Sequence, residues 1–153
     1  MLLLLFQLGK DRYALDASQI VEVTPLVDLK KIPAAPSWVA GIFSYRDTAV
    51  PVIDMTQLAL GRPAQRHIAT RIVLVRYPET GAASNVLGVM VEKATETLRR
   101  ERSDFAEYGL DNAETRYLGP VHDDGQGLIQ LIRIADLLPI DVQNLLFPIP
   151  VET

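Results

Sequence analysis

Few residues in this chain have the types and spacing that chemistry requires, and the most suggestive group is His122-Asp123-Asp124. A histidine beside two carboxylates could ligate a metal ion or exchange protons as an acid–base pair. Gly125 and Gly127 follow directly, however, and Asp-Gly sequences are typical of tight turns. The other histidine, His67, lies in a loop-like stretch. The sequence therefore predicts an ordinary turn after His122 and no metal site.

Other catalytic devices are missing from the sequence. The chain contains no cysteine, which excludes disulfides, thiolate metal sites and a cysteine nucleophile. It has no Gly-x-Ser-x-Gly elbow and no glycine-rich motif that binds nucleotide phosphates. We therefore predict no catalytic residue and no cofactor. A β-barrel enzyme whose site forms around His122 and Asp123 stays open as an alternative.

The remaining candidates are residues suited to binding another protein. Arg46 and Asp47 occupy a short polar turn between two apolar β-branched runs, a pattern typical of a β-hairpin. Arginine is enriched at the energetic centres of protein interfaces, so Arg46 is a candidate contact residue. Leu26 and Val27, which follow Pro25, either line an exposed groove for a helical partner or pack inside the fold.

Charge and hydropathy narrow the class of partner. The 153-residue chain has a formal net charge of −4, and its basic residues are dispersed except at 99–102. Nucleic-acid binding usually needs a clustered basic face, so we predict no nucleic acid, with an OB-like single-strand binder as the disfavoured alternative. The apolar run 2–5 is too short to span a bilayer and lacks a basic leader. We expect a cytoplasmic protein without membrane insertion.

The elements that must position these residues are short strands separated by turns, and they occur twice. The apolar pattern of 2–23 returns over 72–97, and the hairpin 41–55 returns over 119–132. Gly41 and Gly119 each stand nine residues before the second strand of their hairpin. Two related β-rich lobes are therefore expected, as barrels or sandwiches.

Helix signals are sparse and lie at the ends of these repeats. A short helix is predicted at 56–60 because Gly61 provides a C-terminal stop, with a counterpart at 135–138 before Pro139. Apolar residues at helical spacing predict a terminal helix over 141–147. Trp38 is expected to pack in the core.

These segments, in this order, resemble the CheW-like family of chemotaxis coupling proteins over nearly the whole chain. The hairpin is the most specific part, since an arginine at its turn and the Val-Pro-Val-Ile-Asp-Met strand fit the family pattern closely. The segments that carry the resemblance are 4–9, 13–16, 20–23, 32–39, 41–55, 70–75 and 87–92.

The resemblance implies a mainly all-β fold of two SH3-like five-stranded barrels with short helices. It implies a single CheW-like domain over 1–153, with lobes at 1–66 and 67–140, a tail at 141–153, and strand exchange between lobes left open. It also implies a non-enzymatic adaptor that joins methyl-accepting chemoreceptor tips to the regulatory domain of a CheA-type histidine kinase. Arg46 would serve coupling, and Ile20 and Glu22 would fall on the partner-facing surface.

Two departures from the family pattern lie at the hairpin turn. Ser44 replaces the usual asparagine, and Asp47 replaces the usual glycine after the arginine. A glycine at this place indicates a positive φ angle, which aspartate tolerates at a cost of about 1 kcal/mol. Asp47 could also pair with Arg46 and partly neutralise it. These departures leave open a paralogue that serves a surface-sensing, pilus or second-messenger pathway instead of flagellar chemotaxis.

Overall fold

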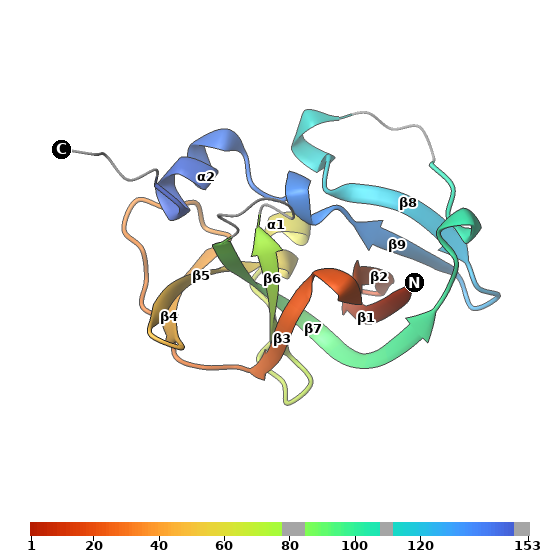
Figure 1. The fold of residues 1–153 in the computed structure, drawn as a ribbon, viewed down its shortest axis with the longest axis horizontal. Coiled ribbons are helices and arrows are strands. Elements are labelled where there is room, and N and C mark those ends of the chain that lie inside the picture. Colours follow the sequence, from red (N-terminus) through yellow and green to blue (C-terminus); the bar gives the residue numbers. More distant parts are fainter. Residues whose placement is uncertain (78–84, 108–111, 149–153) are drawn as a thin grey trace.

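The structure is a computed structural model that describes residues 1–77, 85–107 and 112–148. Strands dominate it, and nine of them join into one hydrogen-bonded network in the part of the chain described (Figure 1). The mainly β fold class predicted from the sequence is confirmed. The strands are β1 Leu2–Leu8, β2 Asp11–Asp16, β3 Ile20–Pro25, β4 Val39–Tyr45, β5 Thr48–Asp54, β6 Arg71–Tyr77, β7 Asn85–Arg99, β8 Leu118–Asp123 and β9 Leu128–Ile132.

The network consists of two five-stranded units that share β7, the long strand that crosses the molecule in Figure 1. In the first unit the strands follow the order β4-β5-β7-β6-β3, and in the second the order is β7-β1-β2-β9-β8. Each unit has one parallel pair, β5 with β7 and β2 with β9, while its other pairs are antiparallel. The two units therefore have the same internal plan, as the repeat in the sequence predicts.

Each unit curls on itself without forming a complete ladder between its edge strands. In the first unit, Lys30 pairs with Ile42 of β4 through an isolated bridge. In the second unit, Ala106 pairs with Val121 of β8 in the same way. Gly41 makes the first bridge possible, because a Cβ there would lie 2.5 Å from the Lys30 carbonyl oxygen. The units are thus barrel-like sheets closed at one edge by single bridges.

The units do not follow the predicted division at residues 66 and 67. The β1–β2 hairpin from the first half pairs with β7 and β9 of the second half. The β6–β7 hairpin from the second half pairs with β3 and β5 of the first half. The lobes are therefore interleaved in the sequence, and the hairpins are exchanged between them. This exchange corrects the sequential lobe boundaries and fits the strand exchange that the sequence left open.

One main core joins the two units. Its buried side chains include Phe6 and Leu15 from the second unit and Ile53 and Val89 from the first. Trp38 is half-buried and packs against this core, in line with the packing role expected for it. A smaller apolar cluster lies within each unit, around Val52 and Leu74 in the first and around Leu5 and Ile129 in the second, but the largest core is shared by both.

Two α-helices complete the fold in the residues that the structure describes. Helix α1 spans Met55–Leu60, where the Asp54 side chain accepts a hydrogen bond from the Gln57 amide and Gly61 ends the helix at φ 73°. Both the helix and its glycine stop agree with the sequence prediction. Helix α2 spans Ile140–Leu146, close to the predicted 141–147. Single 3₁₀ turns lie at Ala17–Gln19, Arg102–Asp104, Ala113–Thr115 and Ile134–Asp136.

Candidate protein-interaction site

The β4–β5 turn consists of Arg46 and Asp47, whose φ angles are both positive, at 48° and 64°. Positive φ at both central residues defines the type I′ turn, whose twist matches that of the strands it joins. Tyr45 and Thr48 pair across the base of the turn. The prediction that position 47 requires a positive φ is confirmed, and the chain direction at Arg46 is fixed by this tight geometry.

Arg46 projects from the turn into solvent, with 79% of its side chain exposed. Its Nη2 lies 3.8 Å from Oε1 of Glu22 on β3, which is an ion pair too long to be a hydrogen bond. Its Cζ lies 5.2 Å from the centroid of the Tyr45 ring. An exposed pair of this kind stabilises a fold by about 0–1 kcal/mol. The arginine is therefore oriented by Glu22 and Tyr45, but its donors stay available to a partner.

The Tyr45 ring contacts both Phe43 and Arg46. Its ring meets the Phe43 ring edge-on, with centroids 6.4 Å apart. Its hydroxyl oxygen is buried and has no hydrogen bond of good geometry in the described part of the chain. The nearby Glu22 carboxylate nevertheless raises the pKa of the Tyr45 phenol, since it favours the protonated hydroxyl beside it. The contact between Tyr45 and Arg46 was not among the features predicted from the sequence.

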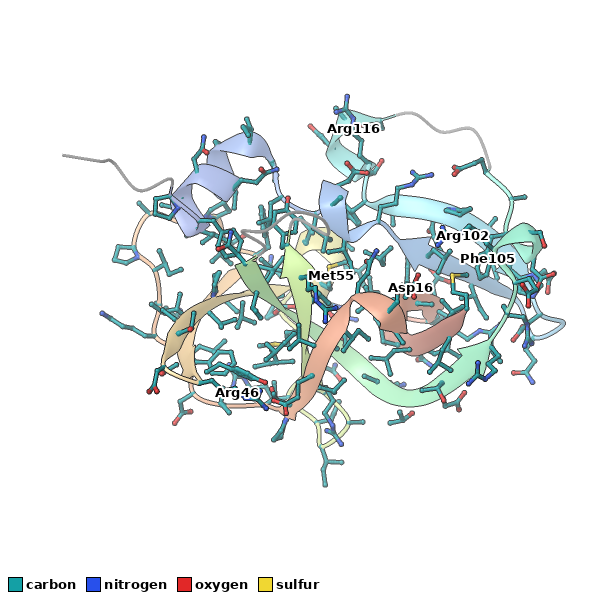
Figure 2. All side chains as sticks on the ribbon, viewed as in Figure 1. Asp16, Arg46, Met55, Arg102, Phe105 and Arg116 are labelled. Carbon is teal, nitrogen blue, oxygen red and sulfur yellow. The ribbon has the colours of Figure 1, made fainter. Side chains whose placement is uncertain are left out.

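Asp47 is exposed and does not neutralise Arg46. Among the described residues, the ion pair of Arg46 is with Glu22, and none joins it to Asp47. The alternative in which Asp47 pairs with its neighbour is thus not realised. We call Glu22, Tyr45, Arg46 and Asp47 the Arg46 cluster; Figure 2 shows its arginine at the edge of the first unit, away from Arg116.

The other predicted contact residues lie deeper in the fold. Ile20 is half-buried against the main core. Leu26 and Val27 are half-buried against a second apolar cluster that includes Val50 and Met90. The structure therefore brings Glu22, Arg46 and Asp47 together on the surface, and it gives Ile20, Leu26 and Val27 packing contacts.

Two exposed valines on β3 were missed by sequence reasoning. Val21 and Val23 flank Glu22 and keep 39% and 41% of their surface exposed. The register between β3 and β6 shifts between Ile20 and Glu22, so the strand does not alternate regularly between buried and exposed positions. A run of β-branched residues interrupted by one glutamate does not reveal such a shift. The two valines thus place exposed apolar side chains on the strand that also carries Glu22 of the Arg46 cluster.

The residues considered for catalysis serve as structural ties. The His122 ring contacts the Asp104 carbonyl oxygen at 3.1 Å, and Nε2 accepts a hydrogen bond from Nε of Arg100 at 3.3 Å. Arg12 holds the Asp124 carboxylate through both of its terminal nitrogens, and this pairing keeps the pKa of Asp124 well below its usual range. Among the described residues, no group of three or more histidine, aspartate or glutamate side chains is arranged to hold a metal ion.

Comparison with known proteins assigns the chain to a family, since residues 2–141 match the CheW-like domain. The chain belongs to the CheW-like family. Over 141 residues, this CheW-like chain is 26% identical to the chemotaxis protein CheW of Helicobacter pylori, an alignment that covers 89% of the chain and 80% of that protein. It is 38% identical to the chemotaxis protein CheW of Treponema pallidum over 53 residues, which are 35% of the chain and 31% of that protein.

A solved structure supports the same fold. The scaffolding protein TtCheW from Thermoanaerobacter tengcongensis superimposes with a TM-score of 0.78 at 21% sequence identity. The match covers 92% of this CheW-like chain and 88% of that protein. The resemblance inferred from the sequence is therefore confirmed. None of the helices in the described residues combines the length and the apolar character needed to cross a membrane.

Proposed function

We propose that this CheW-like protein is a non-enzymatic cytoplasmic adaptor that couples methyl-accepting chemoreceptors to a CheA-type histidine kinase. The single observation that carries the proposal is the Arg46 cluster. An arginine that is 79% exposed sits on a tight turn, and its only ion pair within the described residues is the long one to Glu22, which lies on the strand that also carries the exposed Val21 and Val23. Its family membership and its relatives named chemotaxis protein CheW support the same function.

The chemistry of the cluster suits a protein partner. Interface centres combine apolar contacts with an arginine that finds a carboxylate or carbonyl on the other side. Val21 and Val23 supply the apolar part, and Arg46 supplies the charge-assisted donors. We assign the regulatory domain of the kinase to this surface, with the receptor tip as the second partner of the adaptor.

The test is co-purification of the protein with its cognate kinase regulatory domain and receptor tip. Arg46→Glu should weaken kinase binding by about tenfold or more, because it places two carboxylates together where a cation is needed. The thermal midpoint should hardly change, because an exposed pair contributes only about 0–1 kcal/mol to folding. Lys10→Glu, at an exposed turn of the second unit, is the matched control and should bind normally.

A charge swap distinguishes a direct contact between Arg46 and the partner from a role of the Arg46–Glu22 pair within the protein. The double variant Glu22→Arg with Arg46→Glu restores an ion pair within the protein while reversing both charges toward a partner. Binding should stay weak in this variant if Arg46 contacts the kinase. Recovery of binding in the swap, or normal binding by Arg46→Glu alone, would overturn the assigned role.

A further inference from the structure

The Asp47 side chain makes none of the contacts that usually explain an aspartate in a turn. An aspartate at such a place normally accepts a hydrogen bond from a nearby backbone amide. The carboxylate of Asp16 accepts one from the Ser18 amide at 3.0 Å. The carboxylate of Asp123 accepts one from the Gly125 amide at 2.9 Å. Within the described residues the Asp47 carboxylate forms neither a hydrogen bond nor an ion pair, so the turn does not require this side chain.

The backbone at Asp47 is also strained. Its φ of 64° is an angle that glycine adopts freely, whereas a residue with a Cβ adopts it only at an energetic cost. Strained backbone conformations are concentrated at binding and catalytic sites, where the strain serves the function. Because the Asp47 side chain contributes no contact to the fold that would offset the strain, the position indicates a role toward a partner.

Asp47 and Arg46 present opposite charges side by side at the tip of the hairpin. Both side chains are exposed, and the ion pair of Arg46 is with Glu22 at 3.8 Å. The Glu22 carboxylate is thus already opposed by a cation of the chain itself, whereas the Asp47 carboxylate is not. A surface that docks on this turn meets an unopposed carboxylate next to an arginine whose donors are available.

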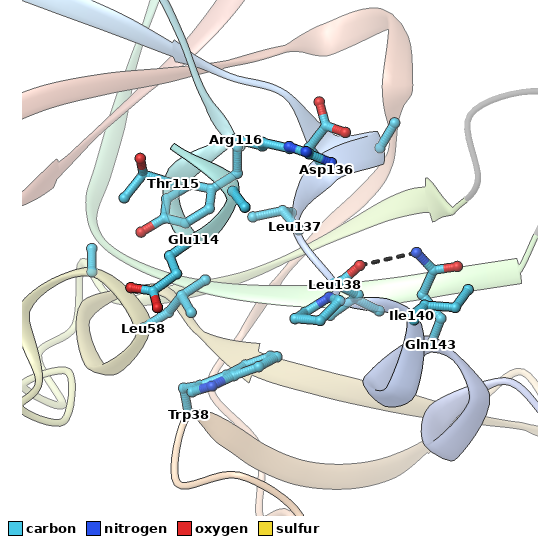
Figure 3. Close-up of a pocket in the computed structure, with 15 residues that line it drawn as sticks. Trp38, Leu58, Glu114, Thr115, Arg116, Asp136, Leu137, Leu138, Ile140 and Gln143 are labelled. Carbon is cyan, nitrogen blue, oxygen red and sulfur yellow. Dashed lines mark hydrogen bonds between the residues drawn. The ribbon is translucent and has the colours of Figure 1, made fainter. Parts of the chain in front are cut away.

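The cleft between the two units shows no such unopposed charge (Figure 3). It has a volume of about 670 Å³ and is lined by Trp38 from the first unit and Tyr117 from the second. Arg116 lines it together with Glu114 and Asp136, so charges of both signs already share its walls. The lining of the cleft therefore favours no particular charge on a partner, in contrast to the tip of the hairpin.

We propose that Asp47 determines which partner the Arg46 cluster accepts, because the docking surface of the kinase carries a lysine or arginine opposite Asp47. This cation lies beside the acceptor that meets Arg46. The inference rests on the proposed coupling function and adds the chemistry of the partner surface. A kinase domain with the cation is attracted as it approaches, whereas one with a carboxylate at the same place meets like charge and is rejected. Asp47 thus distinguishes among related kinase domains that share an acceptor for Arg46.

The test measures association of the cognate kinase regulatory domain with the wild type, Asp47→Asn and Asp47→Lys at low and high salt. Both variants can keep the turn, because asparagine tolerates a positive φ and Lys93 of this chain has a φ of 52°. Asp47→Asn should slow association about three- to fivefold at low salt and reduce its salt dependence, and Asp47→Lys should slow it about tenfold or more. Asp11→Asn is the matched control, since it removes an exposed turn carboxylate of the second unit, and it should associate normally.

Charge reversal on the kinase domain identifies the residue that meets Asp47. Each exposed lysine and arginine of that domain is changed to glutamate in turn. One of these variants should bind the wild-type adaptor about tenfold more weakly and regain binding with Asp47→Lys, because the two reversals restore an opposite pair. Asp47→Gly should bind as weakly as Asp47→Asn although it removes the backbone strain, so stability and binding should change in opposite directions.

The outcomes separate this inference from the coupling function on which it rests. Normal association of Asp47→Asn and Asp47→Lys, with Arg46→Glu still weakened, would overturn the inference and leave the coupling function intact. Weak binding by Asp47→Gly with normal binding by Asp47→Asn would assign the effect to the backbone, and would also overturn it. So would the lack of any kinase variant that Asp47→Lys rescues. Normal binding by Arg46→Glu would overturn the coupling function, and this inference with it.

Discussion

At the scale of single residues, Asp47 combines backbone strain with an exposed position. Its φ of 64° belongs to the left-handed region. There a Cβ atom lies too close to the following carbonyl oxygen, whereas glycine, which has no Cβ, adopts the angle without strain. The Asp47 side chain forms no ion pair within the described residues that would offset this strain. The strain is therefore local to the turn, and it can be relieved without disturbing the Arg46 contacts.

We predict that Asp47→Gly stabilises the protein by about 0.5–1 kcal/mol, because it removes the strain at positive φ. Urea denaturation followed by Trp38 fluorescence measures the effect. Asp28→Gly is the control, since Asp28 is also exposed but does not have a positive φ. The control substitution should slightly destabilise the protein, because glycine there only raises the conformational entropy of the unfolded chain. A loss of stability in Asp47→Gly as large as in the control would contradict the assigned strain.

The turn also shows which features of the site could be predicted from the sequence and which could not. The exposure of Arg46 follows from its place in a polar turn, and the positive φ at position 47 from the glycine that the family pattern has there, so both could be predicted. The contact between Arg46 and Glu22 could not, because it depends on how the sheet curls to bring β3 beside the hairpin. The same holds for Val21 and Val23, whose exposure depends on the register shift in β3.

At the scale of elements, one ion pair anchors the β8–β9 turn. Arg12 on β2 donates to Asp124 at 2.9 and 2.5 Å and to the Gly127 carbonyl oxygen at 2.9 Å. The Asp124 side chain is only 8% exposed, so removing one partner should cost more than breaking a surface pair, because the other charge would be left uncompensated. The turn that resembles a metal site in the sequence is therefore a structural connection between β2 and the β8–β9 hairpin.

We predict that this tie makes stability depend on pH on the acid side. Arg12 lowers the pKa of Asp124 in the folded protein, so the stabilisation is complete above the ordinary aspartate pKa of about 3.9 and is lost progressively as pH falls below it. Asp124→Asn should cost about 1–3 kcal/mol at pH 7 and flatten the acid dependence. Urea midpoints at pH 7 and at pH 3 measure both effects. Asp28→Asn, with no ion pair in the described structure, should leave the wild-type acid dependence intact.

The arrangement of the elements shows why the predicted lobes were in the wrong place. The repeated pattern of apolar runs is the same whether each hairpin pairs within its own half or with the other half. Pairing across halves requires β7 to continue from Asn85 to Arg99, so that both units can use it. The sequence segments 86–91 and 94–97 look like separate strands, and nothing local indicates that they form one.

At the scale of the whole molecule, the shared strand and the shared core imply that the two units unfold together. Strand β7 pairs with β5 and β6 in the first unit and with β1 in the second. The main core contains side chains from both units. A destabilising substitution in the part of β7 that belongs to one unit should therefore also lower the stability of the other unit.

Gly88 on β7 offers a direct test of this coupling. A Cβ at this position would lie 2.8 Å from Cγ2 of Val52 and 3.0 Å from Cγ2 of Ile72, both fully buried in the first unit. Gly88→Ala should therefore overpack that unit and cost about 1–3 kcal/mol. Hydrogen exchange of the backbone amides should show equal loss of protection in β6 and in β2, although β2 lies in the second unit. Loss confined to β4, β5 and β6 would mean that the units open separately, and that the exchanged hairpins do not couple them.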